Sequence, residues 1–292
     1  MKTCAKTRKI VPLVLALLLL FGGCSAVNRD AVFGTNGNET TRRQDVLTVE
    51  FLDVGQANAA LLTCGGKSLL IDGGNVADGA KVTRAVRTVT DRLDYVVNTH
   101  GHEDHVGGLP AVVDAVPVGQ AIVSPVTTDS EYYRDFVDAL ADRGVTPVAG
   151  QAGMQFSLGD AKCTLLGPAA AGSDLNNSSL VLQVRFGGVT FLFMGDAGAE
   201  EERSLIQSGA DVSCDVLAVG HHGSDSATGY VFLRQALPKY AVISVGAGNR
   251  YGHPAESTLS RLRDVGCTVY RTDQSGTITI VTDKNGKIRC PA

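Results

Sequence analysis

Apolar and polar positions follow two different periods along the chain from residue 46 onward. A two-residue period, with turn residues between the runs, predicts strands over 46–54, 59–64 and 68–71. Apolar residues that return every three or four positions then predict a helix over 79–93. The later predicted strands cover 93–98, 121–124, 155–158, 161–166, 180–186, 189–194, 216–219, 241–245, 268–271 and 276–282. The later predicted helices cover 109–115, 130–143, 200–207 and 257–265.

This interleaving of strands and helices predicts an α/β fold in which two mixed sheets pack face to face and helices cover their outer sides. A strand-rich hairpin opens each half of the chain. The sequence shows no short-period repeat and no second domain, so residues 46–292 are predicted to form one domain.

Residues 1–23 are predicted to be a signal peptide and not part of the fold. Four basic residues precede an apolar run over 10–21 that is too short for a comfortable membrane span. Two glycines followed by Cys24 resemble the cleavage site of a bacterial lipoprotein, so we expect a lipid on Cys24 and anchoring at the extracytoplasmic face of the cell membrane. Secretion and an uncleaved signal anchor are the alternatives. Residues 24–45 contain Asn, Gly, Thr, Arg and Asp with little apolar periodicity, which predicts a flexible tether.

Charge and cysteine content narrow the class of protein. Without residues 1–23, 22 Lys and Arg stand against 30 Asp and Glu, which gives a net charge of −8. This acidity argues against a broad nucleic-acid-binding surface, but not against a local positive channel made by bound metals.

Besides Cys24, five widely spaced cysteines remain after residue 23, so at most two disulfides and one free thiol are expected. Cys64, Cys163 and Cys267 are expected in the core.

The strongest chemical signal directly follows the predicted strand over 93–98. It consists of four ligand residues within six positions, namely His100, His102, Asp104 and His105. Neutral imidazole suits Zn²⁺, Mn²⁺ and iron, and a carboxylate completes or bridges such a site. Four ligands this close in sequence do not fit one ion, so we expect two divalent ions, Zn or Mn. The His-x-His pair would bind one ion, and Asp104 with His105 would bind the other.

The remaining histidines and two aspartates also lie at predicted strand ends or in loops. We expect Asp196 to bridge the two ions, and Asp72 to orient the histidines of the site. An ordinary role as a turn aspartate is the alternative for each. One of His221 and His222 is expected on the second ion, with His222 favoured, while the other contacts substrate or packs.

Three further residues are candidates for substrate contacts. His253 is either an acid on the substrate side or a structural loop histidine, and with Asp104 it forms the candidate catalytic pair. Ser224 and Asn249 are candidates for binding phosphate oxygens, with an ordinary role as polar loop residues as the alternative.

The chemistry that this constellation predicts is metal-dependent hydrolysis. Two ions that share a carboxylate and a water lower the pKa of that water toward neutrality, which supplies a hydroxide nucleophile and stabilises charge on an attacked phosphoryl or acyl group. The sequence offers no competing Gly-x-Ser-x-Gly motif, no phosphate-binding P-loop and no Gly-x-Gly-x-x-Gly after a strand.

Seven short segments, taken in order, carry a family resemblance. They lie at 51–56, 70–74, 99–108, 176–182, 194–196, 219–224 and 251–254. Together they resemble the metallo-β-lactamase superfamily and, within it, the C-terminal domain of ComEC-type competence proteins and its stand-alone lipoprotein relatives. The resemblance implies an αββα sandwich, hydrolysis of phosphodiesters, and degradation of one DNA strand during uptake at the cell surface. DNA and the competence DNA-uptake machinery would then be partners.

Two features depart from the family pattern. A glycine and an acidic residue usually follow Gln56 there, whereas this chain has Ala57 and Asn58, which weakens the nuclease interpretation if the acidic residue takes part in catalysis. No histidine lies between His105 and Asp196, where many superfamily members have a metal ligand. The competence-type domains share this gap, which leaves the first ion with few ligands and favours a weakly held ion or Mn²⁺.

Two other functions stay open. One is a hydrolase of the same fold that acts on a phosphocholine ester, a nucleotide or a lactone, and the acidic net charge favours it. The other is a non-catalytic surface binding module that keeps a metal for structure, which the intact set of histidines argues against.

Overall fold

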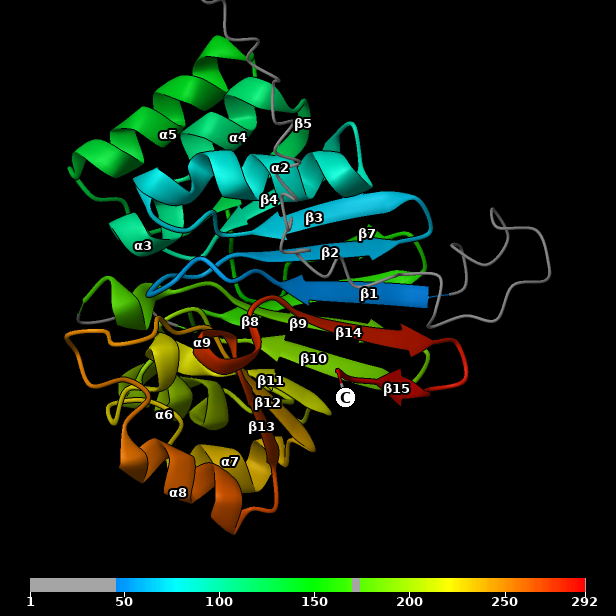
Figure 1. Ribbon diagram of the computed structural model, residues 1–292, viewed down its shortest axis with the longest axis vertical. Helices are drawn as coiled ribbons and strands as arrows, with labels where there is room; N and C mark the ends of the chain where they lie inside the picture. The colour runs from blue at the N-terminus through cyan, green and yellow to red at the C-terminus, as the bar shows by residue number, and fades with distance from the viewer. Residues whose placement is uncertain (1–45, 170–173, 292) are drawn as a thin grey trace, which may run out of the picture. The chain divides into compact units, whose positions relative to one another are not determined.

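Two mixed β-sheets pack face to face at the centre of the structure, a computed structural model that describes residues 46–169 and 174–291 (Figure 1). Helices cover the outer side of each sheet, which confirms the predicted α/β sandwich. The predicted signal peptide, the tether and Cys24 lie outside the described residues. Within the described ranges, no helix is long and apolar enough to cross a membrane.

The first sheet has eight strands in the order β15-β14-β1-β2-β3-β4-β5-β6. Pairing is antiparallel from β15 to β3 and parallel from β3 to β6. Its strands are β1 (Val46–Phe51), β2 (Ala60–Cys64), β3 (Lys67–Ile71), β4 (Leu93–Asn98), β5 (Val118–Val123), β6 (Val148–Ala149), β14 (Ile278–Asp283) and β15 (Ile288–Arg289). Ile71 pairs with Val97 in the parallel part, so the segments that follow β3 and β4 leave the sheet at the same edge.

The second sheet has seven strands in the order β13-β12-β11-β10-β9-β8-β7. Pairing is antiparallel from β7 to β10 and parallel from β10 to β13. Its strands are β7 (Gln155–Leu158), β8 (Ala161–Gly167), β9 (Val181–Phe186), β10 (Val189–Phe193), β11 (Val216–Ala218), β12 (Tyr240–Ile243) and β13 (Thr268–Arg271). Phe193 pairs with Ala218, so the segments after β10 and β11 also leave at one edge.

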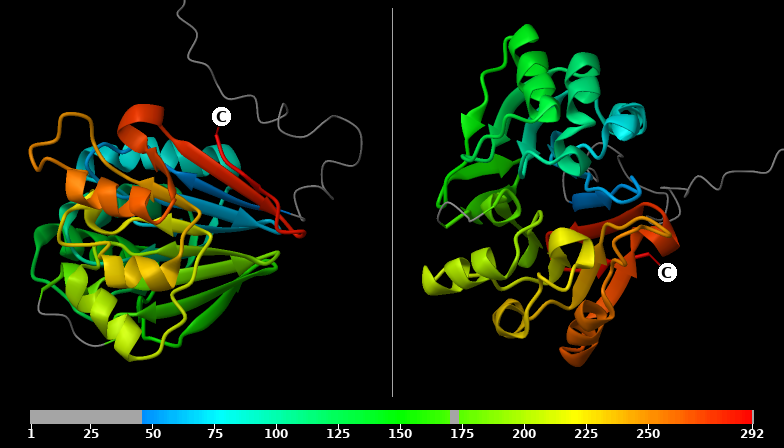
Figure 2. Two further views of the ribbon diagram at one scale, coloured as in Figure 1. Left: turned by 90° about the horizontal axis from the view of Figure 1, so that it is seen from below. Right: turned by 90° about the vertical axis from the view of Figure 1, so that its left-hand side faces the viewer.

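Helices form the two outer layers of the described part of the chain (Figures 1 and 2). Those on the first sheet are α2 (Gly79–Val89), α4 (Leu109–Ala115) and α5 (Glu131–Asp142), and those on the second are α6 (Ala199–Gln207), α7 (Tyr230–Ala236) and α8 (Glu256–Asp264). Single turns of helix lie in the connections: η2 (Val76–Asp78), α3 (Glu103–Val106), η3 (Asn176–Ser178), η4 (Gly220–Gly223) and α9 (Thr272–Ser275).

Three apolar cores hold these layers together. The middle core fills the space between the sheets with inward side chains such as Leu47 and Phe191. The outer cores lie between each sheet and its helices, where Val82 and Val86 of α2 and Leu233 of α7 are fully buried. Each side chain of this kind contributes about 1.5–3 kcal/mol when it leaves water, so the sandwich is a rigid frame for the loops at its edge.

Local differences from the predicted elements have physical causes. Helix α2 ends at Val89 and not at residue 93, because Leu93 begins β4 and pairs with Val118 of β5. The sequence does not predict helix α7, because its apolar residues run consecutively over 230–233 and show no helical period. The short helix α3 forms inside the predicted metal-binding loop, where acidic residues in its first turn favour a helix start.

All five cysteines in the described ranges are free, so no disulfide joins any of them. Cys64, Cys163 and Cys267 are buried, which confirms their predicted place in the core. Burial raises the pKa of Cys163 and of Cys267 to about 12. Both side chains are therefore protonated, unreactive packing groups at neutral pH.

A close backbone crossing brings the turn after β3 against the predicted metal-binding loop. The Gly73 N–H donates to the His105 carbonyl at 2.7 Å, and the Gly108 N–H donates to the Gly74 carbonyl at 3.0 Å. A Cβ atom on Gly108 would lie 2.0 Å from the Gly73 carbonyl oxygen, so the crossing needs glycine. This packing fixes Asp72 relative to His105.

Gly108→Ala is expected to destabilise the protein by about 1–3 kcal/mol, because the backbone must move to accept the methyl group. Gly229→Ala is the matched control: Gly229 also has a negative φ (−71°, against −84° at Gly108), and its new Cβ would come no closer than 3.2 Å to a Glu202 oxygen. Denaturant unfolding of both variants measures the difference. Equal stability would show that the crossing is not tightly packed.

Candidate metal centre

Strand ends of both sheets bring all six histidines of the chain together. Three follow β4, two follow β11 and one follows β12: His100, His102, His105, His221, His222 and His253. Their rings form one continuous series of contacts, with centroid separations between 4.1 and 6.3 Å. The two sheets therefore assemble one cluster from loops that are far apart in sequence.

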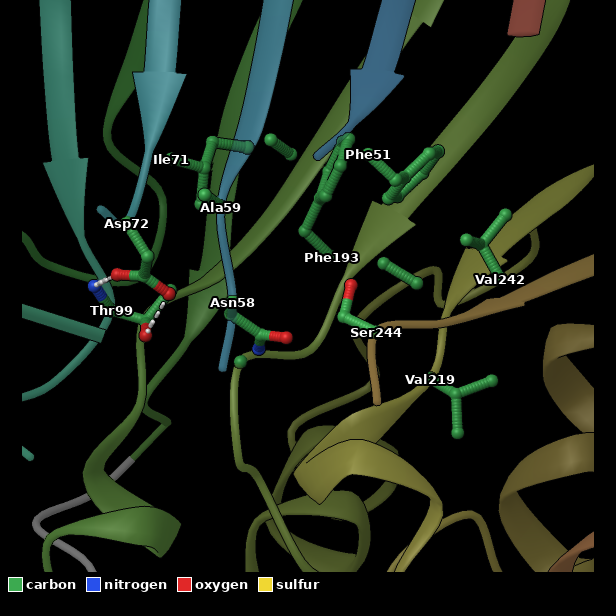
Figure 3. A pocket seen from close by; sticks show the side chains of 13 residues that line it. Phe51, Asn58, Ala59, Ile71, Asp72, Thr99, Phe193, Val219, Val242 and Ser244 are labelled. Carbon is green, nitrogen blue, oxygen red and sulfur yellow. Dashed lines mark hydrogen bonds between the residues drawn. The ribbon is translucent and has the colours of Figure 1, made fainter. Parts of the chain in front are cut away.

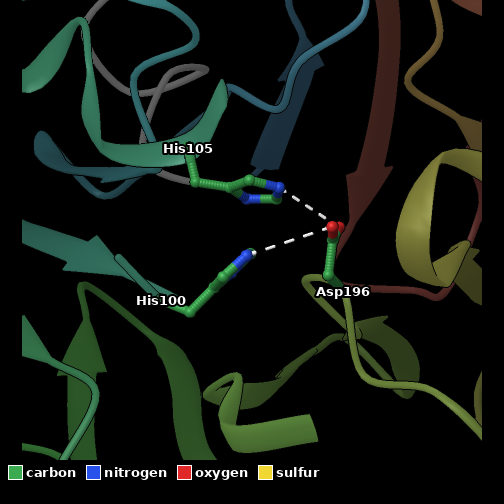
Figure 4. A group of neighbouring side chains, drawn as sticks. All are labelled: His100, His105 and Asp196. Carbon is green, nitrogen blue, oxygen red and sulfur yellow. Dashed lines mark ion pairs between the residues drawn. The ribbon is translucent and has the colours of Figure 1, made fainter. Parts of the chain in front are cut away.

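The Asp196 carboxylate lies at the middle of this cluster and is 2% exposed (Figure 4). Its Oδ1 atom is 3.1 Å from His105 Nε2 and 3.7 Å from His222 Nε2. Its Oδ2 atom is 4.0 Å from His100 Nε2 and 3.8 Å from His221 Nε2. Each oxygen thus faces a different pair of histidines, and the predicted bridging role of Asp196 stays a prediction.

Three buried atoms at this point have no hydrogen-bond partner: His105 Nε2, Asp196 Oδ1 and His222 Nε2. Asp104 Oδ2 lies 3.2 Å from His222 Nε2 and completes the group. Ligand atoms that each lie about 2.0–2.2 Å from one ion are roughly 3–4 Å apart, so these separations fit a shared cation. Buried polar atoms without partners are rare in native proteins, and a metal ion would satisfy all three at once.

His105 and His222 are each held by a hydrogen bond at Nδ1, the ring nitrogen that does not face Asp196. His105 Nδ1 lies 2.8 Å from Asp72 Oδ2, and His222 Nδ1 lies 2.9 Å from the Ser244 carbonyl. These acceptors keep a proton on Nδ1 and turn Nε2 toward the centre. Histidines that bind a metal usually donate their other ring N–H to a carboxylate or carbonyl in the same way. Asp72 is itself fixed by the Thr99 N–H and hydroxyl, each at 2.8 Å.

A second group of ligand atoms surrounds His100. His100 Nε2 lies 3.0 Å from His102 Nδ1, and His102 is the exposed member of the pair. The Thr99 and Ser179 hydroxyls lie 3.2 and 3.3 Å from His100 Nδ1. His105 has ligand atoms near both groups, so the predicted division of the loop between two ions stays a prediction.

Nearby charges set the protonation of the centre. Burial by itself lowers the pKa of His105, but Asp196 and Asp72 outweigh burial and hold that pKa well above its usual value. Burial also opposes ionisation of Asp104, yet the nearby His222 ring brings the pKa of Asp104 down to about 2. Burial and neighbouring His105 hold the pKa of His100 well below its usual value. Without a cation, His105 therefore carries a proton that a metal ion must displace.

The loop after β12 supplies the predicted substrate-side residues. His253 Nδ1 lies 3.5 Å from the Gln56 amide nitrogen, while the Gln56 oxygen accepts from the Gly246 N–H at 3.1 Å. The Ser224 hydroxyl lies 3.0 Å from that of Ser226. Asn249 uses its amide within its own loop, as described below. Phosphate contacts by Ser224 and Asn249 therefore stay predictions.

A small pocket lies beside the centre, between the ends of the two sheets (Figure 3). Asp72, Thr99, Phe193 and Ser244 line it together with Asn58, whose side chain points into the pocket. The Asn58 N–H donates to the Asp104 carbonyl at 2.9 Å. The residue that departs from the family pattern is thus in direct contact with the metal-binding loop.

Sequence reasoning missed the residues that support the ligands. Thr99, Ser179, Ser244 and Gln56 each contact a histidine of the cluster through a side-chain or backbone oxygen or an amide. Thr99, Ser179 and Gln56 lie inside the segments that carry the family resemblance, which was the available signal. Ser244 acts through its carbonyl, so its side chain gave no signal at all.

The chain belongs to the metallo-beta-lactamase superfamily, whose sequence model matches residues 52–247. Superfamily members are generally metal-dependent hydrolases, and the fold binds divalent metals. The two groups His100–His105–Asp196 and Asp104–His105–His222 are places where this chain could hold such ions.

Among curated relatives, the chain is similar to three proteins from bacteria. It is 34% identical over 188 residues to ComE operon protein 3 of Bacillus subtilis, covering 64% of this chain and 24% of the relative. It is 32% identical over 240 residues to competence protein ComA of Neisseria gonorrhoeae, covering 80% of this chain and 32% of the relative. It is 30% identical over 238 residues to recombination protein 2 of Haemophilus influenzae, covering 80% of this chain and 28% of the relative. The chain thus spans about a quarter to a third of the length of these relatives.

Solved structures share the fold at low sequence identity. The metallo-beta-lactamase fold protein YhfI of Bacillus subtilis aligns with a TM-score of 0.56 at 13% identity, over 85% of this chain and 100% of that chain. Igni18, a metallo hydrolase of the archaeon Ignicoccus hospitalis, aligns with a TM-score of 0.51 at 18% identity, over 80% of this chain and 98% of that chain. These likenesses confirm the αββα sandwich.

Metal affinity is expected to rise with pH. The raised pKa of His105 means that a cation displaces a proton at neutral pH, so affinity should change by about tenfold per pH unit for each proton displaced. Titration calorimetry with Zn²⁺, in buffers of different ionisation enthalpy, counts the protons released by chelator-stripped protein.

Asp72→Asn is the informative variant for this experiment. It removes one of the two carboxylates that raise the pKa of His105, so fewer protons should be released on metal binding at neutral pH. An affinity that does not depend on pH in either protein would contradict the assigned protonation of the centre.

Proposed function

We propose that the chain is a hydrolase that uses two divalent metal ions, Zn or Mn, to cleave phosphodiester bonds of DNA. The convergence of buried, unpartnered ligand atoms on His105, Asp196 and His222 supports the metal part of this proposal most strongly. The similarity to competence proteins supports DNA as the substrate.

In this proposal the ligands divide over two ions. His100 and His102 would hold the first ion, and Asp196 would be a ligand that both ions share. The second ion is held by the group Asp104, His105 and His222. We assign His221 to the first ion, because its Nε2 atom lies 3.8 Å from the Asp196 oxygen that also faces His100. It would stand in for the histidine that is missing between His105 and Asp196.

The chain's own residues prepare the reaction. When bound, the two ions would acidify a water molecule and neutralise charge on the attacked phosphoryl group. Asp104, with its pKa of about 2, stays ionised at every physiological pH and contributes fixed negative charge beside that water. His253 donates a proton to the leaving oxygen. Burial, assisted by His221 and His222, lowers the pKa of His253, which makes its protonated form a stronger acid.

The proposal places the enzyme outside the cytoplasm. A lipid on Cys24 would anchor it to the extracytoplasmic face of the cell membrane, and residues 24–45 would be the tether between the anchor and the folded part. Competence proteins among the relatives make the DNA-uptake machinery the proposed partner. Secretion without an anchor is the alternative.

A second candidate function is hydrolysis of a smaller substrate, such as a phosphocholine ester, a nucleotide or a lactone. The net charge of −8 after residue 23 favours it, because an acidic surface repels a long polyanion. The same two-metal chemistry would serve both functions.

Residues 25–292 are expected to bind about two Mn²⁺ or Zn²⁺ ions and to hydrolyse both bis-(p-nitrophenyl) phosphate and single-stranded DNA. His102→Ala and Asp196→Ala should each lower both rates about a hundredfold or more without unfolding the protein, because each removes a proposed ligand. Elemental analysis, initial rates and circular dichroism provide the three measurements.

Asp211→Ala is the control, because Asp211 is a surface aspartate that pairs with Arg185 away from the cluster. Full activity of Asp196→Ala would contradict the two-metal mechanism. Bound metal with cleavage of the small diester alone would favour the second candidate function, and bound metal without any hydrolysis would favour a binding module.

Asn58→Asp is expected to raise DNA cleavage severalfold, because it restores the acidic side chain usual at this position in competence-type domains. The backbone contact of residue 58 with Asp104 does not depend on the side chain, so the loop should keep its position. Asn58→Ala, which removes the amide without adding charge, separates the two effects. Equal DNA cleavage by all three proteins would show that residue 58 does not limit the reaction.

A further inference from the structure

An exposed tyrosine continues the series of rings outward from the metal centre. The His253 ring meets the His221 ring edge-on at 5.7 Å, and the Tyr251 ring stacks on His253 at 5.7 Å with an interplanar angle of 26°. Tyr251 is 57% exposed, whereas His253 is half-buried. Large apolar side chains with this exposure are few in the described ranges, and Tyr251 is the one whose loop carries a proposed catalytic residue.

A positive charge lies on the same aromatic ring. The guanidinium carbon of Arg250 is 5.0 Å from the centre of the Tyr251 ring, and one of its N–H groups donates to the Tyr251 hydroxyl at 2.9 Å. Arg250 is exposed and forms no ion pair with a carboxylate of the described residues. In a chain with an acidic net charge, the loop that carries His253 therefore also carries an exposed positive charge.

The loop holds this pair in position through Asn249. The Asn249 amide nitrogen donates to the Gly246 carbonyl at 2.9 Å and to the His253 carbonyl at 2.6 Å. Its oxygen accepts from the backbone N–H groups of Tyr251 and His253, each at 3.1 Å. These four bonds fix the backbone on either side of an aromatic ring that is not itself buried. A ring presented in this way binds a flat ligand with little further loss of conformational freedom.

We propose that Tyr251 and Arg250 form a binding site for one nucleotide of single-stranded DNA beside the scissile phosphate, with the base stacked on Tyr251 and a phosphate held by Arg250. The inference rests on the proposed function and names the strand form of its substrate. Every base has a flat π-face, so stacking suits an enzyme that does not read sequence. A base inside a duplex is already stacked on its neighbours, so the site favours single strands.

The test measures binding separately from hydrolysis. Fluorescence anisotropy follows the binding of metal-loaded protein to a short phosphorothioate oligothymidylate, which keeps bases and charges but resists cleavage. An abasic strand of equal length and charge is the second ligand. The variants are Tyr251→Ala, Tyr251→Phe and Arg250→Ala. Tyr230→Ala is the matched control, because Tyr230 is a 45% exposed tyrosine on α7.

Tyr251→Ala should weaken binding of the oligothymidylate roughly five- to a hundredfold, and should leave the abasic strand unaffected. Tyr251→Phe keeps the ring and should retain most of the affinity. Arg250→Ala should weaken both strands and reduce the slope of log affinity against log salt by about 0.7. Tyr230→Ala should bind like the unaltered protein.

Equal losses for both strands in Tyr251→Ala, or no loss for either, would overturn the stacking site. Cleavage of DNA that is indifferent to Tyr251 would overturn the inference and leave the proposed function standing. Tyr251-dependent binding of the oligothymidylate, by a protein that cleaves no phosphodiester, would support the binding site and overturn the proposed function.

Discussion

The buried carboxylate of Asp196 is the constraint on which the centre depends. It follows a strand of the second sheet, yet its nearest neighbours include histidines from a loop of the first sheet. An ionised carboxylate that is 2% exposed needs nearby positive charge. Protonated His105 supplies that charge when no metal is bound, and a divalent cation would supply it otherwise. The two halves of the sandwich therefore meet around one negative charge, which histidines of both halves face.

Support for the ligand atoms comes from residues just outside the cluster. Asp72 and the Ser244 carbonyl hold the outer nitrogens of His105 and His222, so their inner nitrogens cannot rotate away. Asp72 is in turn held by Thr99 and by the crossing of two glycine-containing turns. Asp72 and Ser244 follow strands that are neighbours of the strands that carry the ligands, so the frame that folds the protein also orients the site.

Charge shapes how this centre would meet a polyanion. The chain is acidic beyond residue 23, so attraction over long distances is weak. Positive charge is instead local: it would come from the bound ions and from Arg250 on the neighbouring loop. Such an arrangement suits a substrate that is delivered to the site by another component, as proposed for the uptake machinery, better than one captured from solution.

The sequence by itself determined the α/β class, most strands and helices, and the residue types of the centre. Local periodicity fixes the elements, and the dense His-x-His-x-Asp-His segment is specific enough to identify a metal-binding loop. Only the tertiary structure decided that Asp196 faces four histidines, that His222 and not His221 is buried against Asp104, and that Tyr251 stacks on His253. Those facts depend on which strands are neighbours and on backbone carbonyls such as that of Ser244. A local sequence pattern shows neither the neighbouring strands nor the positions of these carbonyls, because both arise from pairing between segments far apart along the chain.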